Sequence, residues 1–142
     1  YGPDQDYEKL IPLVIKNIFE NKSIPIYGKG ENIRDWLYVG DHVRMVSKIA
    51  SIENSQGVFN IGNQKEISML ELADTIHRLV GKEFSPRHLP PRENDPPRRV
   101  PDCEKAYSIC GPCEFSLEEG LSETIEWYKM KSSKQDIAGA DE

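Results

Sequence analysis

The sequence predicts a fold of the α/β class. Several segments carry apolar residues at helical spacing, and short apolar runs bounded by glycine, proline or asparagine lie between them. Two Ser-x-x-Glu sequences mark helix starts. The elements alternate without the regular spacing of a complete parallel βαβ series, so they could also form pieces of the α+β class, and we expect them to pack on a further structural unit.

The chain begins with a predicted helix over 11–21, in which Pro12 falls in the first turn, where its missing N–H costs no hydrogen bond. A strand is predicted at 24–27. Gly28 and Gly30 then form a turn, because glycine readily adopts the positive φ that tight turns need. A second strand is predicted at 33–39.

Asp41 is predicted to cap a helix over 41–52, since its carboxylate can accept a hydrogen bond from a backbone amide of the first turn. The apolar residues of this helix are expected to be buried: Val43, Val46, Ile49 and Ala50. A third short strand is predicted at 58–62.

Two later helices have clear starts. Ser68 with Glu71, and Ser116 with Glu119, can each form a capping box in which hydroxyl and carboxylate bond reciprocally to backbone amides. The first of these helices is predicted to end at Gly81, a natural left-handed cap, and the second to extend to about residue 131.

Between these two helices we expect an edge strand near 84–89, a stretch rich in proline and arginine, and a short helix started by Asp102. Residues from 132 onward are small and polar, which predicts a disordered tail. The sequence therefore predicts one domain over 1–131 and a tail over 132–142.

The composition excludes several classes of protein. The net charge of −6 argues against general nucleic-acid binding, and no apolar run approaches the roughly 18 residues of a membrane-spanning helix. Three cysteines, an odd number, fit a reducing compartment better than a disulfide framework, so we expect a cytoplasmic protein. A start at Tyr1 without methionine or export signal is expected for a fragment of a longer chain.

Five ordered blocks resemble one enzyme family. The central block, at 27–43, reads YGKGENIRDWLYVGDHV; EKLIP precedes it at 8–12, and FNIG, DPPRRVPD and LEEGL follow at 59–62, 95–102 and 117–121. They resemble blocks of extended short-chain dehydrogenase/reductases that act on nucleotide sugars, the NAD-dependent epimerases and dehydratases. Early blocks are most similar to dTDP-glucose 4,6-dehydratases and the 95–102 block to UDP-glucuronate decarboxylases, so the substrate stays open.

The resemblance implies a chain that is the carboxyl-terminal, substrate-binding part of a Rossmann-type enzyme. Such enzymes bind NAD at an amino-terminal Gly-rich turn and use a Tyr-x-x-x-Lys pair, and this chain contains neither. We therefore expect no catalytic residue and no cofactor site here, with NAD held by a missing amino-terminal half that precedes Tyr1. The parent enzyme would be a homodimer formed through that half.

The resemblance also implies a site for a UDP- or dTDP-sugar. Arg34 matches a ligand of the diphosphate, and arginine suits phosphate because its planar fork donates paired, charge-assisted hydrogen bonds. The alternative is a surface arginine paired with Asp35. In the proline-rich stretch, Arg98 and Arg99 are candidates for a second contact with the diphosphate, and Arg98 is preferred. The alternative is that this stretch is a solvated basic loop, and we assign Arg87 and Arg92 to such a loop.

Further positions are weaker candidates. Asn60 could bind a phosphate or a sugar hydroxyl, or could stabilise a turn. The segment Pro25, Ile26 and Tyr27 resembles the strand that binds the base in this family. Lys9 and Leu10 match positions that line the family's substrate pocket. Tyr27 could equally be a core residue.

Cys110-Gly-Pro-Cys113 spells the thioredoxin tetrapeptide, but a redox site needs it at the start of a long helix, and here it follows a short one. We interpret it as coincidence and predict no metal site, because no fourth ligand stands at suitable spacing. Two rival hypotheses remain, a small dithiol oxidoreductase and a stand-alone or vestigial binding module.

By resemblance, the elements at 33–39 and 41–52 would pack on the missing half. The isolated chain would then expose apolar surface, and exposed apolar patches favour association. We expect it to be marginally stable or to self-associate.

Overall fold

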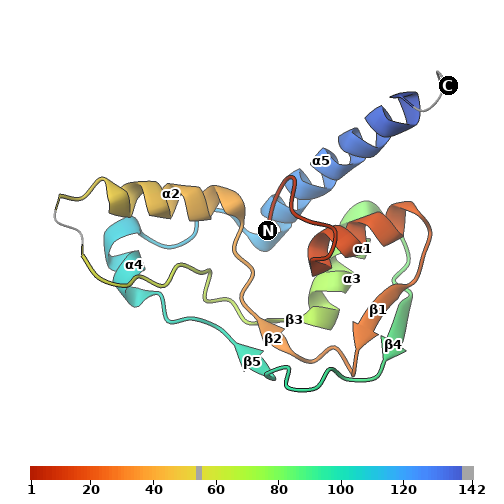
Figure 1. Ribbon diagram of the computed structural model, residues 1–142, viewed down its shortest axis with the longest axis horizontal. Coiled ribbons are helices and arrows are strands. Elements are labelled where there is room, and N and C mark those ends of the chain that lie inside the picture. Colours follow the sequence, from red (N-terminus) through yellow and green to blue (C-terminus); the bar gives the residue numbers. More distant parts are fainter. Residues whose placement is uncertain (54–55, 139–142) are drawn as a thin grey trace.

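The computed structural model describes residues 1–53 and 56–138. Helices and strands alternate within them (Figure 1), which confirms the α/β class. In chain order the elements are α1 (Leu10–Phe19), β1 (Ile24–Tyr27), β2 (Ile33–Arg34), α2 (Val39–Ala50), β3 (Ile67–Ser68), α3 (Met69–Val80), β4 (Pro86–Leu89), β5 (Arg98–Arg99), α4 (Glu104–Cys110) and α5 (Leu117–Ala138). No helix among these residues is long and apolar enough to cross a membrane.

Two small sheets connect distant parts of the sequence. β1 pairs in parallel with β4, in a register that joins Ile24 to Pro86 and Tyr27 to Leu89. β2 lies between β3, which is antiparallel to it, and β5, which is parallel. Because both parallel pairs join the same two segments, the chain from β4 to β5 runs beside the chain from β1 to β2 (Figure 1).

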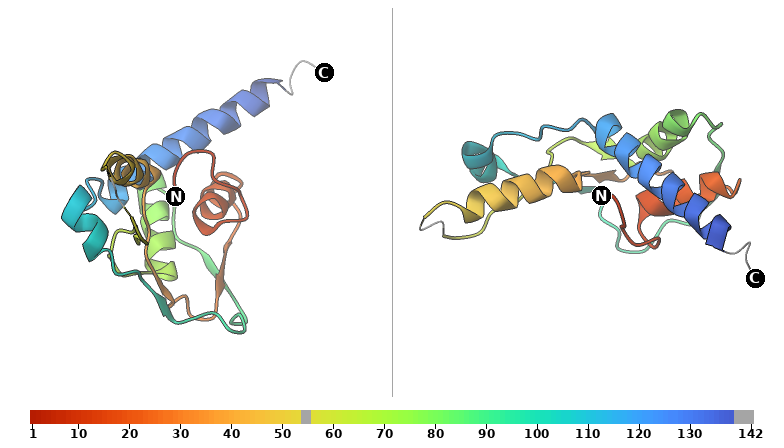
Figure 2. Two further views of the ribbon diagram at one scale, coloured as in Figure 1. Left: turned by 60° about the vertical axis from the view of Figure 1, so that its left-hand side comes forward. Right: turned by 90° about the horizontal axis from the view of Figure 1, so that it is seen from above.

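The main hydrophobic core lies where α1, α3 and α5 pack against one another and against β1. The buried face of α1 consists of Ile11, Val14, Ile15 and Ile18, at the i, i+3, i+4, i+7 spacing of an amphipathic helix. Each such side chain contributes roughly 1.5–3 kcal/mol of transfer free energy when buried. Beyond this core, α5 continues outward (Figure 2).

A second group of elements is built from α2, α4 and the start of α5. Asp41, fully buried in the first turn of α2, accepts hydrogen bonds from the backbone amides of Glu114 and Phe115 and from the Arg44 guanidinium. Together these contacts hold the pKa of Asp41 below its usual value although burial opposes them. The ionised carboxylate therefore fastens α2 to the segment that leads into α5.

Predictions that rest on local signals are confirmed. The strand at 24–27 forms as β1, and Gly28 and Gly30 have φ of 59° and 75°. Ser68 forms its capping box, and α3 ends at Gly81, whose φ is 74°. At the start of α5, the amides of Ser116 and Glu119 donate reciprocally to each other's side chains.

The strand predicted at 33–39 is wrong beyond its first two residues. After β2 the backbone leaves the sheet and bonds to the first residue instead: the amino group of Tyr1 donates to Leu37 O at 2.7 Å, and Val39 N donates to Tyr1 O at 2.8 Å. The helix start is also wrong, because α2 begins at Val39 with Tyr38 as its N-cap residue. Asp41 therefore lies inside the helix.

The strand predicted at 58–62 does not form among the described residues. Side chains of the α4 region satisfy its carbonyl oxygens instead: Lys105 Nζ donates to Val58 O at 3.0 Å and Tyr107 OH to Gly62 O at 2.9 Å. A strand needs a neighbouring strand to complete its backbone hydrogen bonds, and the described residues place none beside this segment. The two-residue β5 was not predicted as a strand, since it carries two charged residues.

The burial predicted for α2 is also wrong. Val43 and Val46 are 57% and 43% exposed, Ala50 is exposed, and Ile49 is only half-buried. Val39, the first residue of the helix, is exposed as well. Buried Met45 packs toward α4 on the other side of the helix. An uncovered apolar face, the α2 face, therefore runs along α2 through Val39, Val43 and Val46.

The carboxyl-terminal helix is longer than predicted. α5 runs to Ala138, so residues 132–138 of the predicted tail are helical. Ser132 Oγ donates to Tyr128 O and Ser133 Oγ to Lys129 O, both at 3.0 Å, which satisfies the hydroxyls within the helix. Residues 139–142 of that tail lie outside the described residues.

Candidate functional site

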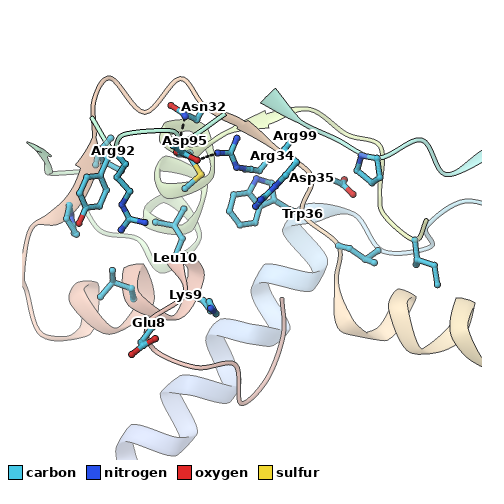
Figure 3. A pocket seen from close by; sticks show the side chains of 18 residues that line it. Glu8, Lys9, Leu10, Asn32, Arg34, Asp35, Trp36, Arg92, Asp95 and Arg99 are labelled. Atoms are coloured by element: carbon cyan, nitrogen blue, oxygen red, sulfur yellow. Dashed lines mark hydrogen bonds and ion pairs between the residues drawn. The ribbon is translucent and has the colours of Figure 1, made fainter. Parts of the chain in front are cut away.

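A cavity of about 610 Å³ opens between the start of α1, β1, β2 and the segment from β4 to β5 (Figure 3). This volume is in the range of small-molecule sites. Seven of the predicted site residues line it: Lys9, Leu10, Pro25, Ile26, Tyr27, Arg34 and Arg99. They come from four elements far apart in sequence, and the two parallel strand pairs bring them together.

One end of the cavity is apolar and aromatic. Alternation along β1 puts Ile24 and Ile26 in the core and leaves Tyr27 exposed on the other face. The guanidinium of Arg92 stacks on the Tyr27 ring, 4.0 Å from its centroid. Tyr27 is therefore a wall of the cavity, and its alternative assignment as a core residue is wrong.

Arg34 is nearly buried at the cavity wall, 8% exposed, and its side chain is tightly held. Nη1 donates to Ile33 O at 2.7 Å and to Pro96 O at 2.9 Å, and Nη2 lies 2.5 Å from Asp95 Oδ1. The acidic partner of Arg34 is therefore Asp95 and not the adjacent Asp35.

Asp35 has a structural task. Both of its carboxylate oxygens accept from the backbone amide of Asn63, at 3.1 and 2.8 Å. Burial raises the pKa of Asp35, while backbone amides of Asn63, Gln64 and Lys65 act in the opposite direction. This contact ties the end of β2 to the loop before β3.

The structure places Arg99 at the cavity and Arg98, the residue preferred from the sequence, outside it. Successive residues of a strand point to opposite faces, and in β5 it is Arg99 that lines the cavity. Arg98 lies outside it, with Nη2 at 2.6 Å from Glu66 Oε1. The hydrogen bond from Arg98 lowers the pKa of that exposed carboxyl.

Asn60 is also outside the cavity. Its Nδ2 donates to Asp102 O at 3.0 Å, which links the loop before β3 to the start of α4. This geometry matches the alternative reading, an asparagine that stabilises a turn, and gives no support to a ligand role.

Several cavity residues were missed by the sequence reading. Arg92, assigned to a solvated loop, lines the cavity, and so do Asp95 and Trp36. The Trp36 indole donates to Ile67 O at 3.4 Å, which fixes the ring against β3. A strand was expected just before Arg92, but its parallel pairing with β1 is a long-range feature that no local pattern encodes.

The Cys110–Cys113 tetrapeptide lacks the setting of a redox site. Cys110 is buried as the last residue of α4, and its thiol donates to Met45 O at 3.5 Å. Burial raises the pKa of the Cys113 thiol, which disfavours its thiolate form. All three cysteines are free, and within 1–53 and 56–138 no cluster of His, Cys, Asp and Glu is suited to hold a metal.

Comparisons with known proteins point to one enzyme family. Residues 1–62 match the model of the "NAD dependent epimerase/dehydratase family". The chain is 40% identical over 138 residues to dTDP-glucose 4,6-dehydratase 1 of Escherichia coli strain K12, covering 90% of this chain and 38% of that one. By sequence and fold, the chain matches the NAD-dependent epimerase/dehydratase family.

Solved structures of this family have the same fold. dTDP-glucose 4,6-dehydratase from Bacillus anthracis, in complex with NAD, superposes with a TM-score of 0.84 at 33% identity, covering 94% of this chain and 43% of that one. UDP-glucose 4-epimerase from Thermotoga maritima, solved with UDP-glucose, superposes with a TM-score of 0.86 at 30% identity, covering 93% of this chain and 44% of that one.

The chain spans about two fifths of the length of the curated relatives it matches. Its fold is thus part of a Rossmann-type extended short-chain dehydrogenase/reductase, as the five sequence blocks predict.

Proposed function

We propose that the cavity binds the diphosphate and base of a UDP- or dTDP-sugar. The chain would be the substrate half of an NAD-dependent nucleotide-sugar 4,6-dehydratase, epimerase or decarboxylase. The observation that carries this proposal is the cavity itself, which gathers four cationic side chains beside an apolar and aromatic end: Lys9, Arg34, Arg92 and Arg99.

The cations suit a diphosphate. Among the described residues, Lys9, Arg92 and Arg99 form no ion pair with a carboxylate, so their charges are available to an anionic ligand. Arginine donates paired, charge-assisted hydrogen bonds to phosphate oxygens. The chain carries −6 overall, whereas in the cavity the four cations outnumber the three carboxylates that also line it.

The apolar end suits a pyrimidine. Leu10, Pro25 and Tyr27 offer surfaces to the faces of a flat ring, and aromatic contact with a base contributes roughly 1–3 kcal/mol. The relatives support the ligand class, since the Thermotoga epimerase was solved with UDP-glucose. The residues proposed to contact the nucleotide sugar are therefore Lys9, Leu10, Pro25, Ile26, Tyr27, Arg34, Arg92 and Arg99.

We propose that the chemistry belongs to the rest of the protein, which would hold NAD and the catalytic residues. The α2 face supports this division, because an apolar helix face of this kind needs a covering partner. It also favours the enzyme half over a stand-alone module. Dimerisation through the cofactor half and a cytoplasmic location belong to the same proposal.

The full-length protein that contains this chain tests the proposal. It is incubated with dTDP-glucose, UDP-glucose and UDP-glucuronate in the presence of NAD, and products are identified by mass spectrometry. We expect one of these sugars to be converted, with a higher KM in Arg99→Ala than in the adjacent control Arg98→Ala. Absence of both binding and conversion for every UDP- and dTDP-sugar would overturn it.

A further inference from the structure

Asp95 occupies the anion-binding side of Arg34. One carboxylate oxygen, Oδ1, lies 2.5 Å from Arg34 Nη2, and the other, Oδ2, accepts from Asn32 Nδ2 at 3.0 Å. Figure 3 shows both contacts at the cavity wall. The carboxylate thus lies against a terminal nitrogen of Arg34 that a phosphate oxygen of a ligand could also contact.

Arg34 does not need Asp95 for its orientation. Its other terminal nitrogen, Nη1, donates to the carbonyl oxygens of Ile33 and Pro96, and these two bonds fix the guanidinium plane. Asp95 adds a full negative charge at the cavity. A phosphate that approached the same nitrogen would be repelled by this carboxylate, because like charges a few ångströms apart are unfavourable.

Asp95 has room to leave. Its side chain is 35% exposed, against 10% for the side chain of Arg34, and it lies in the exposed segment between β4 and β5. The side chain can rotate into solvent without disturbing the core, since no residue between β4 and β5 is a member of the core. Arg34, held by two carbonyl groups, would stay in place.

We propose that Asp95 is an internal competitor for Arg34: its carboxylate pairs with the guanidinium before the ligand binds and is displaced by a phosphate of the ligand. This inference rests on the proposed function, because it takes the ligand to be a nucleoside diphosphate. It assigns Asp95 as a residue that sets affinity for the diphosphate, separate from the residues that attract it. Binding then costs the breaking of one ion pair.

Titration calorimetry on the full-length protein tests this with UDP and uridine, and with dTDP and thymidine. Asp95→Asn removes the charge and keeps the shape, and Glu93→Gln is its matched control, an exposed acid of the same segment outside the cavity. We expect Asp95→Asn to bind UDP or dTDP about tenfold more tightly, equivalent to about 1.4 kcal/mol. Nucleoside affinity, and the affinities of Glu93→Gln, should stay unchanged.

The outcomes separate the two proposals. If the wild type binds the diphosphates but Asp95→Asn binds them equally or more weakly, the competitor role is overturned and the proposed function stands. Equal tightening by Glu93→Gln would reduce the effect to overall charge and overturn it too. No diphosphate binding by either protein would overturn both proposals. Circular dichroism checks folding, and Asp95→Ser serves as a second variant.

Discussion

Arg98 and Arg99 are consecutive residues of β5 with different surroundings: Arg99 lines the cavity, and Arg98 Nη2 lies 2.6 Å from Glu66 Oε1 outside it. The first prediction compares Arg99→Ala with Arg98→Ala. A charge-assisted hydrogen bond contributes roughly 1.5–3 kcal/mol, so Arg99→Ala should weaken UDP or dTDP binding by about tenfold or more. Arg98→Ala should change it less than about twofold. Calorimetry decides, and equal losses would contradict the assignment.

The second prediction concerns Arg92 and Tyr27, whose side chains stack at 4.0 Å. Arg92→Ala should weaken UDP binding by about tenfold and uridine binding far less, because it removes a charge that a nucleoside does not use. Tyr27→Ala should weaken both by similar factors, because the base loses its aromatic contact. Tyr27→Phe is the control and should bind like the wild type. If Arg92→Ala abolished uridine binding while Tyr27→Ala did not, this division between a phosphate contact and a base contact would be contradicted.

The third prediction concerns the α2 face. Replacing Val43 and Val46 by glutamine should reduce self-association of the isolated chain, measured by sedimentation velocity, because exposed apolar surface is removed. Stability should change by less than about 0.5 kcal/mol, as for other exposed positions. Met130→Gln, an equally exposed apolar residue on α5, is the control and should leave association unchanged. In the full-length protein, replacing the same two valines should instead lower stability.

The fourth prediction concerns the capping box of α3. Ser68 Oγ accepts from Glu71 N, and Glu71 Oε2 accepts from Ser68 N. Ser68→Ala should lower the free energy of unfolding by about 1 kcal/mol in urea denaturation. Ser47→Ala, at an exposed position within α2, should change it by less than about 0.5 kcal/mol. A loss at Ser68 no larger than at Ser47 would show that the cap does not stabilise α3.

The fifth prediction concerns alkaline pH. Burial, together with Asp35 and Asp102, raises the pKa of Cys103 from 9.0 to about 11. As pH rises through this window the unfolded chain loses the thiol proton first, so it binds fewer protons than the folded chain and stability falls. Urea unfolding should show this fall between about pH 9 and 11. The stability of Cys103→Ala should fall less steeply over the same range. Identical curves of stability against pH for the variant and the wild type would contradict the raised pKa of Cys103.

Local signals in the sequence were enough for much of the fold. Ile24–Tyr27 is an apolar run next to a Gly-x-Gly turn, and the Ser68 and Ser116 capping boxes are complete within four residues, so the strand and both helix starts were predicted where they lie. The segments at 33–39 and 58–62 have strand-like sequences, but their backbone bonds depend on what lies beside them. The extent of these strands therefore could not be predicted from the local sequence.

The site was predictable only in part for the same reason. Positions near the central block, such as Tyr27 and Arg34, line the cavity as the family blocks imply. The contribution of the 90–101 segment depends on the parallel pairing of β4 with β1 and on which way each residue of β5 faces. Without this pairing, Arg92 was assigned to solvent and Arg98 was preferred to Arg99.

The central claim, that this cavity binds a pyrimidine nucleoside diphosphate, is tested most directly by titrating the full-length protein with UDP and dTDP. Tyr27 and Trp36 line the cavity, so tyrosine and tryptophan fluorescence should report binding. We predict saturable binding of at least one nucleotide, weakened by Arg99→Ala and retained by Arg98→Ala. Absence of saturation by either nucleotide in a folded, NAD-loaded protein would contradict the account.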